Sequence, residues 1–340
     1  MVSKSVAVVV IGRNEGARLQ RCLRSIPAEV PAVYVDSGST DDSVAFARSI
    51  GVAVLSLDMS IGFTAARARN VGWRHIVADP ALDAEFIQFV DGDCELDADW
   101  IDKALAAMQA EPGVAAVFGR RRERFPGRSI YNRMCDDEWN VPVGIVAACG
   151  GDALFRVAAL KAANGYSDDL IAGEEPDLCL RLARLDWFVR RIDGEMTLHD
   201  ANILRFGSWW QRTKRGGFAY AAHVLRHGER SDPQWRRQLK SILFWGFVWP
   251  VAGIGLACLG ALWQPLAGAL LLAALAASYA VQVGRIAARK HRAGFDRRFS
   301  LRYGGLIVIG KFAEFSGALK CWTNHVLHRQ HRLIEYKQPV

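Results

Sequence analysis

The sequence predicts an α/β fold with a mostly parallel sheet and helices on both faces, followed by a helical membrane module. In the N-terminal part, short apolar runs alternate with segments of helical spacing, which is typical of parallel sheets covered by helices. Polar clusters follow these apolar runs. Further along, residues 241–284 contain no charged residue, a pattern more typical of membrane helices than of a buried soluble hairpin.

The predicted strands are the apolar runs at residues 6–11, 32–36, 52–57, 86–91 and 114–119. Helices are predicted between them, at residues 16–26, 42–50, 64–75 and 97–110. Another strand-like run covers residues 187–192. Ligands of open α/β sheets bind outside the carboxyl ends of the strands, so polar residues after successive strands are expected to face one crevice.

Two carboxylates one residue apart, Asp91 and Asp93, end the apolar run 86–91. Alternation along an extended chain places them on the same side. Carboxylate oxygens at such a strand end suit Mg²⁺ or Mn²⁺ that holds a diphosphate. A surface turn is the alternative interpretation, because Asp and Gly are common turn residues.

Three more polar clusters follow or adjoin the predicted strands. They are residues 12–16 with Asn14 and Glu15, residues 36–41 with Asp36, and residues 62–72 with Arg69. Each alone is typical of helix capping, but together they indicate one binding crevice. A dinucleotide site and a P-loop are disfavoured, because neither glycine-rich motif is present.

The ordered motifs resemble family 2 glycosyltransferases of the GT-A fold. The resemblance covers about residues 5–215 and rests on residues 14–15, 35–41, 68–70, 91–93, 150–156 and 173–182. It implies a GT-A, Rossmann-like domain that transfers a sugar from a nucleotide-sugar donor with inversion at the anomeric carbon. A UDP-sugar is the favoured donor.

The resemblance also implies roles for single residues. Asp36 would contact the donor nucleoside, Arg69 the base or diphosphate, and Asp91 the ribose side. Asp93 would bind the divalent metal, Mn²⁺ or Mg²⁺. In related enzymes a histidine at the place of His199 can complete that metal site. The alternative for His199 is a solvated turn residue. The full set of expected site residues comprises donor-binding Asn14, Glu15, Asp36, Arg69, Asp91 and Asp93, with Gly151 and Asp152 on the acceptor side.

The catalytic base is expected at Glu174 or Glu175. The family's Glu-Asp motif aligns with this pair, which places Glu175 at the base position. Because this chain has Glu where the family has Asp, either Glu174 or Glu175 could be the base. Ser37 is a second departure, since the family often has Asp there. Pro176 is predicted at position N1 of a helix, with Glu175 as its N-cap, and Asp177 and Asp152 are the next candidates for the base.

The uncharged stretch is too long for one span, and residues 263–265 break it into spans at about 241–263 and 265–284. Basic residues flank both spans, whereas the connecting turn is uncharged. This pattern predicts a multi-pass protein of the inner (plasma) membrane with a cytoplasmic catalytic domain. No signal peptide is expected at the N-terminus.

The predicted domains are residues 1–225 and 226–340. Residues 301–322 are expected to form a helix lying in the interface, with a third span as the alternative. A basic tail follows, containing His325, His328, Arg329, His331 and Arg332.

These observations predict a membrane-attached inverting glycosyltransferase that acts on a hydroxyl acceptor, expected to be a lipid-linked saccharide of cell-envelope or exopolysaccharide synthesis or another glycan. The net charge of +8 indicates contact with lipid phosphate rather than nucleic acid. Seven scattered cysteines fit a reducing compartment. The alternatives are a polyprenyl-phosphate sugar synthase and a catalytically inactive membrane scaffold; a haloacid-dehalogenase-type phosphatase is disfavoured by Glu95.

Overall fold

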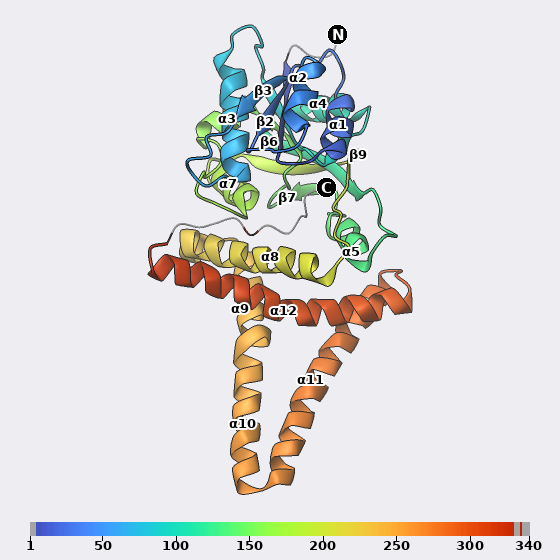
Figure 1. Ribbon diagram of the computed structural model, residues 1–340, viewed down its shortest axis with the longest axis vertical. Coiled ribbons are helices and arrows are strands. Elements are labelled where there is room, and N and C mark those ends of the chain that lie inside the picture. Colours follow the sequence, from blue (N-terminus) through green and yellow to red (C-terminus); the bar gives the residue numbers. More distant parts are fainter. Residues whose placement is uncertain (1–4, 330–333, 335–340) are drawn as a thin grey trace. The chain divides into compact units, whose positions relative to one another are not determined.

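The computed structural model describes residues 5–329 and residue 334, and the chain forms two compact units that divide between Leu204 and Arg205 (Figure 1). The sequence-based boundary at residue 225 falls inside a helix of the second unit, α8 (Phe206–His227). The predicted tail residues His331 and Arg332 lie outside the described residues.

The described part of the first unit contains one nine-stranded mixed sheet with the order β3-β2-β1-β4-β8-β6-β9-β5, and β7 also pairs with β9. Its strands are β1 (Val6–Gly12), β2 (Ala32–Asp36), β3 (Ala53–Ser56), β4 (Phe86–Asp91), β5 (Cys94–Leu96), β6 (Val114–Glu123), β7 (Gly144–Val146), β8 (Ala153–Arg156) and β9 (Phe188–His199). Its helices are α1 (Ala17–Arg24), α2 (Ser43–Ser49), α3 (Ala65–Ala78), α4 (Trp100–Ala110), α5 (Ile130–Glu138), α6 (Val157–Ala162) and α7 (Glu174–Ala183).

The predicted α/β fold is confirmed, because β3, β2, β1 and β4 are all parallel and helices flank the sheet. The central strand β1 is almost entirely buried, as its run of valines predicts. Helix α3 approaches it closely at Gly72, where an added Cβ would lie 2.3 Å from Val9 Cγ1. Beyond β4 the sheet continues through the antiparallel strand β8.

Two strands are longer than the sequence predicts. The runs 114–119 and 187–192 continue as β6 to Glu123 and as β9 to His199, and the two strands pair in parallel along this length with local register shifts. Charged residues in both extensions hide the apolar pattern, so periodicity alone ends the strands early. His199 is therefore the last residue of a strand and is 6% exposed, which rules out the solvated turn.

The second unit is helical. It contains α8, the short 3₁₀ turn Gly228–Arg230, α9 (Pro233–Leu243), the π-helical turn Phe244–Val248, α10 (Trp249–Trp263), α11 (Pro265–Arg292) and α12 (Arg297–Val326). Helices α8 and α12 pack backbone to backbone, because an added Cβ at Gly217 would lie 1.9 Å from Glu314 O.

Helices α10 and α11 form the predicted hairpin, which turns at Gln264 (Figure 1). Two continuous segments, Pro233–Trp263 and Pro265–Arg292, are the helices among the described residues that are long and apolar enough to cross a membrane. Helix α12 covers the predicted interfacial segment 301–322.

Candidate active site

The carboxyl ends of β1, β2 and β4 lie at one edge of the sheet. Asp36 pairs in register with Gly12, and Asp91 pairs with Ile11. The side chains that the sequence singles out after successive strands therefore start from neighbouring positions.

Asn14 and Asp36 hold the loops after β1 and β2. Asn14 has a φ of +53°, and its Oδ1 accepts a 2.7 Å hydrogen bond from Thr40 N. The Asp36 carboxylate, itself 5% exposed, accepts hydrogen bonds of 3.0 Å from Gly38 N and Ser39 N. Glu15 is also buried and pairs with Arg18 at 2.9 Å. These three predicted donor-binding residues fix the two loops and their turns.

Arg69 connects the predicted donor-binding and catalytic residues. It comes from α3, is 2% exposed, and its guanidinium lies 2.9 Å from Asp91, 3.0 Å from Glu174 and 3.1 Å from Glu175. One cation thus faces three carboxylates from two different elements. The arrangement brings β4 and the first turn of α7 to the same place.

Arg121, near the carboxyl end of β6, supplies the second cation. Its guanidinium lies 3.0 Å from Asp91 and 2.7 Å from Asp152, and Asp152 also accepts hydrogen bonds from Asp91 N and Thr197 Oγ1. Asp152 is 1% exposed, so both of its oxygens are buried and engaged. It organises the site and is poorly placed to take a proton from a substrate.

Gly151 lies directly against the Arg69–Asp91 pair. An added Cβ would lie 2.4 Å from Arg69 Nη2 and 2.8 Å from Asp91 Oδ2. This position therefore requires glycine because of close approach, and any side chain would displace the ion pair.

The start of α7 differs from the prediction. The N-cap is Gly173, with a φ of +82°, so Glu174 and Glu175 are the first two helical residues and Pro176 is the third. Proline is tolerated here because the first turn of a helix has no intrahelical acceptors for its N–H groups. Asp177, the fallback candidate, is buried and accepts bonds from Ser167 Oγ and Arg181 Nε.

The pKa of Glu175 is raised from 4.5 to about 7. Burial is the largest cause and the neighbouring Glu174 carboxylate the second, while Arg69 opposes both. The Glu175 side chain is 15% exposed, against 4% for Glu174. Glu175 is thus the more accessible of the two carboxyl groups, and it titrates where a general base is effective.

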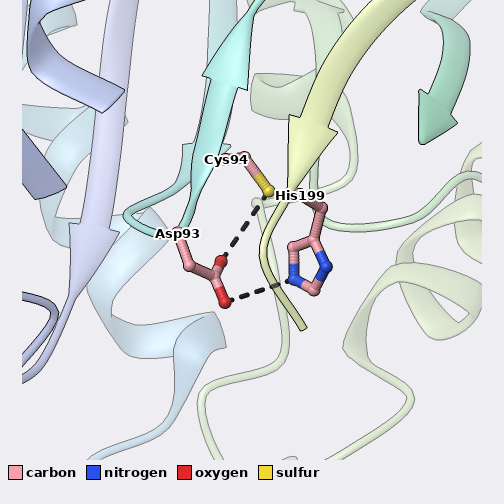
Figure 2. A group of neighbouring side chains, drawn as sticks. All are labelled: Asp93, Cys94 and His199. Atoms are coloured by element: carbon pink, nitrogen blue, oxygen red, sulfur yellow. Dashed lines mark hydrogen bonds and ion pairs between the residues drawn. The ribbon is translucent and has the colours of Figure 1, made fainter. Parts of the chain in front are cut away.

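Asp93, in the turn after β4, meets His199 at the end of β9 (Figure 2). His199 Nε2 lies 3.2 Å from Asp93 Oδ2, and its Nδ1 lies 3.8 Å from Glu123 Oε2. Burial lowers the pKa of His199, but the carboxylates of Asp93 and Glu123 outweigh burial and the pKa is raised. Asp91 pairs with Arg121 and Asp93 lies against His199. Gly92 and Asp93 form the turn after β4, so strand alternation does not place the two carboxylates on the same side.

These residues fit a divalent metal. The ligand atoms of Asp93, Cys94 and His199 lie within 4.8 Å of one another, and His199 Nε2 faces the Asp93 carboxylate. Mn²⁺ accepts carboxylate and imidazole ligands. Burial raises the pKa of the Cys94 thiol well above its ordinary value, and a neutral thiol is a poor ligand. Asp93 and His199 are the residues that would hold the ion.

Sequence reasoning missed Arg121, Glu123 and Trp139. Arg121 lies over the Trp139 ring at 5.3 Å, and the same ring meets His199 edge-on at 4.6 Å. The run Arg120-Arg121-Arg122 directly after an apolar strand was a usable signal for Arg121. No local pattern marks Glu123 or Trp139, because their contacts join segments far apart in the chain.

The first unit has a GT-A-like fold with acidic residues at the ends of its strands. Residues 7–161 match the model of glycosyl transferase family 2. This match lies entirely within the first unit.

Two pre-mycofactocin glycosyltransferases, from two strains of Mycobacterium tuberculosis, are 25% identical over 246 residues, which cover 68% of this chain and 50% of each relative. The chain thus spans about half the length of these curated relatives. A mannosyltransferase from Pyrobaculum calidifontis, solved in complex with GDP-Man and Mn²⁺, shares the fold with a TM-score of 0.56, 19% identity and coverage of 93% of this chain and 86% of that one.

Proposed function

We propose that this protein is a membrane-attached inverting glycosyltransferase that moves a sugar from a nucleotide-sugar donor to an acceptor hydroxyl. The observation that supports this most is the position of Glu175. Its carboxyl group has a pKa raised to about 7 and shares Arg69 with Asp91 at the carboxyl edge of the sheet. A hydroxyl acceptor needs such a base, because it is a weak nucleophile while it keeps its proton.

In this proposal, the two loops fixed by Asn14 and Asp36 receive the nucleoside, and Asp91 faces the ribose side. Glu15 supports the loop after β1. Asp93 and His199 would hold Mn²⁺ or Mg²⁺, which would supply positive charge to neutralise the diphosphate. A UDP-sugar is the donor we favour, and GDP-sugars are tested beside it because the Pyrobaculum relative was solved with GDP-Man.

Glu175 would take the proton of the acceptor hydroxyl while the hydroxyl oxygen forms its bond to the anomeric carbon of the donor sugar. The bond from that carbon to the diphosphate breaks on the opposite face, which inverts the configuration. Arg69 orients Glu175, while Gly151 leaves room beside the Arg69–Asp91 pair on the acceptor side. Asp152 holds Arg121 and the backbone of Asp91 in place.

We further propose that the hairpin α10–α11 crosses the inner membrane with both ends in the cytoplasm. The basic residues lie before α10 and at the end of α11, and the turn at Gln264 is uncharged. The catalytic domain, residues 1–225 by sequence, would then be cytoplasmic, with α12 in the interface. A lipid-linked saccharide is the acceptor class that fits a membrane-attached enzyme of envelope or exopolysaccharide synthesis.

The experiment is a thermal-shift panel of UDP- and GDP-sugars with and without Mn²⁺, run on the full chain. We expect one nucleotide to raise the melting temperature only when Mn²⁺ is present. Asp93→Ala should abolish this shift, whereas Asp99→Ala, which removes a carboxylate whose side chain is 76% exposed, should keep it. An unchanged Mn²⁺-dependent shift in Asp93→Ala would refute the metal role.

A further inference from the structure

A cavity of about 530 Å³ lies wholly within the second unit, between α9, the π-helical turn, α11 and α12. The wall residues that matter most are Trp245, Gln282, Arg289, Lys290, Tyr303 and Lys311. None of them takes part in the glycosyl-transfer site proposed above.

The wall of this cavity is cationic. Arg289, Lys290 and Lys311 contribute to it, and no carboxylate lines it among the described residues. Arg289 is exposed and forms no ion pair within the described part of the chain. Lys290 Nζ lies 4.8 Å from the Tyr303 ring centroid, and Lys311 Nζ lies 2.8 Å from Glu314 Oε2. Three cationic side chains on a wall that has no carboxylate among its described lining residues favour an anionic ligand.

The other part of the wall is apolar or uncharged. Trp245 and Gln282 belong to the uncharged stretch 241–284, whereas Arg289 and Lys290 follow it. The cavity therefore lies where the apolar hairpin ends and the charges begin. In a membrane protein this is the level of the lipid headgroups, where Trp and Tyr are enriched.

An irregularity of the backbone forms one side of the cavity. Residues Phe244–Val248 form a π-helical turn, and the carbonyl of Trp245 accepts a 2.7 Å hydrogen bond from Tyr279 Oη. At Gly246 an added Cβ would lie 2.4 Å from Lys311 O, so α12 crosses the turn in direct contact. Single π-helical turns occur frequently at functional sites. The contact between this turn and α12 brings Trp245 and Lys311 into the wall of the same cavity.

We propose that this cavity binds the phosphate of a membrane lipid, with Arg289, Lys290 and Lys311 around the phosphate and the lipid chain leaving along the apolar hairpin. This proposal rests on the proposed membrane attachment, but not on the identity of the sugar donor. An anionic phospholipid and a polyprenyl phosphate share this chemistry. The first would anchor the module, and the second would supply an acceptor or carrier.

The test is native mass spectrometry of the full chain released from detergent micelles. The probes are phosphatidylglycerol, a polyprenyl phosphate, phosphatidylcholine and inorganic phosphate. The test variant is Arg289→Gln with Lys290→Gln. Its matched control is Arg285→Gln with Arg292→Gln, which removes the same charge from the same helix at positions outside the cavity wall.

We expect at least one anionic lipid to remain bound to the wild type and to the control. In the test variant its affinity should fall roughly 30-fold, at about 1 kcal/mol per basic residue. Preference between the two anionic lipids identifies the source. Equal retention of phosphatidylcholine, equal losses in test and control variants, or inorganic phosphate binding as tightly as the lipids would overturn the proposal. The thermal-shift panel with Asp93→Ala measures donor binding independently of lipid binding, so failure of the lipid proposal can be distinguished from failure of the proposed glycosyl transfer.

Discussion

Replacing Glu175 with Gln tests the proposed base most directly. Gln keeps the size of the side chain and can still accept a hydrogen bond from Arg69, but it cannot take a proton. We expect the transfer rate to fall by about 10²–10⁴-fold with donor affinity nearly unchanged, because a general base contributes only in the transition state. The assay is steady-state transfer to the acceptor, with donor affinity measured by calorimetry.

The raised pKa of Glu175 gives the pH profile of the wild type. A base must be unprotonated, so with a pKa of about 7 the transfer rate should rise roughly tenfold from pH 5 to pH 6 and level off above pH 8. The residual activity of Glu175→Gln should lack this rise. A rate that is flat between pH 5 and pH 8 in the wild type would refute the assignment.

The same shift affects stability. The folded pKa of Glu175, about 7, exceeds the ordinary value of 4.5, so between these values the unfolded chain binds fewer protons. Stability from this group therefore falls as pH rises through that window, by about 3 kcal/mol at most. Glu175→Gln should lose this component and melt at a higher temperature than the wild type at pH 8. A lower melting temperature at pH 8 would contradict the cause given for the shift.

Glu174→Gln is the matched control and should reduce transfer less than Glu175→Gln. If Glu174→Gln is inactive and Glu175→Gln active, the base is the other residue of the pair. If both variants remain active, the acceptor needs no base, as expected for a phosphate acceptor, which is already ionised.

Three further outcomes follow from the structure. Gly151→Ala should lower transfer by about 10²-fold while the fold remains intact by circular dichroism, because its Cβ would displace Arg69 and Asp91. His199→Gln should weaken Mn²⁺ binding measured by calorimetry by at least about tenfold, and unchanged binding would exclude it as a ligand. Cysteines at positions 237 and 289 should be labelled from the same side of the membrane and one at position 264 from the other; opposite sides for the first two would refute the hairpin topology.

Much of the fold follows from the sequence because the early strands are apolar and buried. The runs that became β1, β2 and β4 have apolar side chains that pack into the core, so periodicity and composition both identify them. The hairpin is equally clear, because the uncharged stretch and Pro265 mark both helices and the turn.

The site was less predictable where it depends on pairing between distant segments. Asp93 and His199 meet only because Cys94 of β5 pairs in register with His199 of β9. The position of Arg69 against Glu174 and Glu175 depends on how α3 packs relative to α7. Sequence spacing carries no information on such distances, and only the family resemblance suggested these roles. The sequence-based helix start was wrong because it relied on the preference of proline for position N1. In the structure Gly173, in a left-handed conformation, is the N-cap, and the helix begins at Glu174.

The chain after β9 is held firmly up to the boundary between the two units. Ala201 N donates to Glu123 Oε2, Ile203 N donates to Asn132 Oδ1, and Ile203 O accepts a bond from Ser129 Oγ, at 3.0, 3.0 and 2.6 Å. Every proposed donor, metal and catalytic residue precedes Leu204. A fragment ending at Leu204 would therefore finish on an anchored segment rather than on a loose end. We expect that such a fragment would allow donor binding to be measured by calorimetry without the helical second unit.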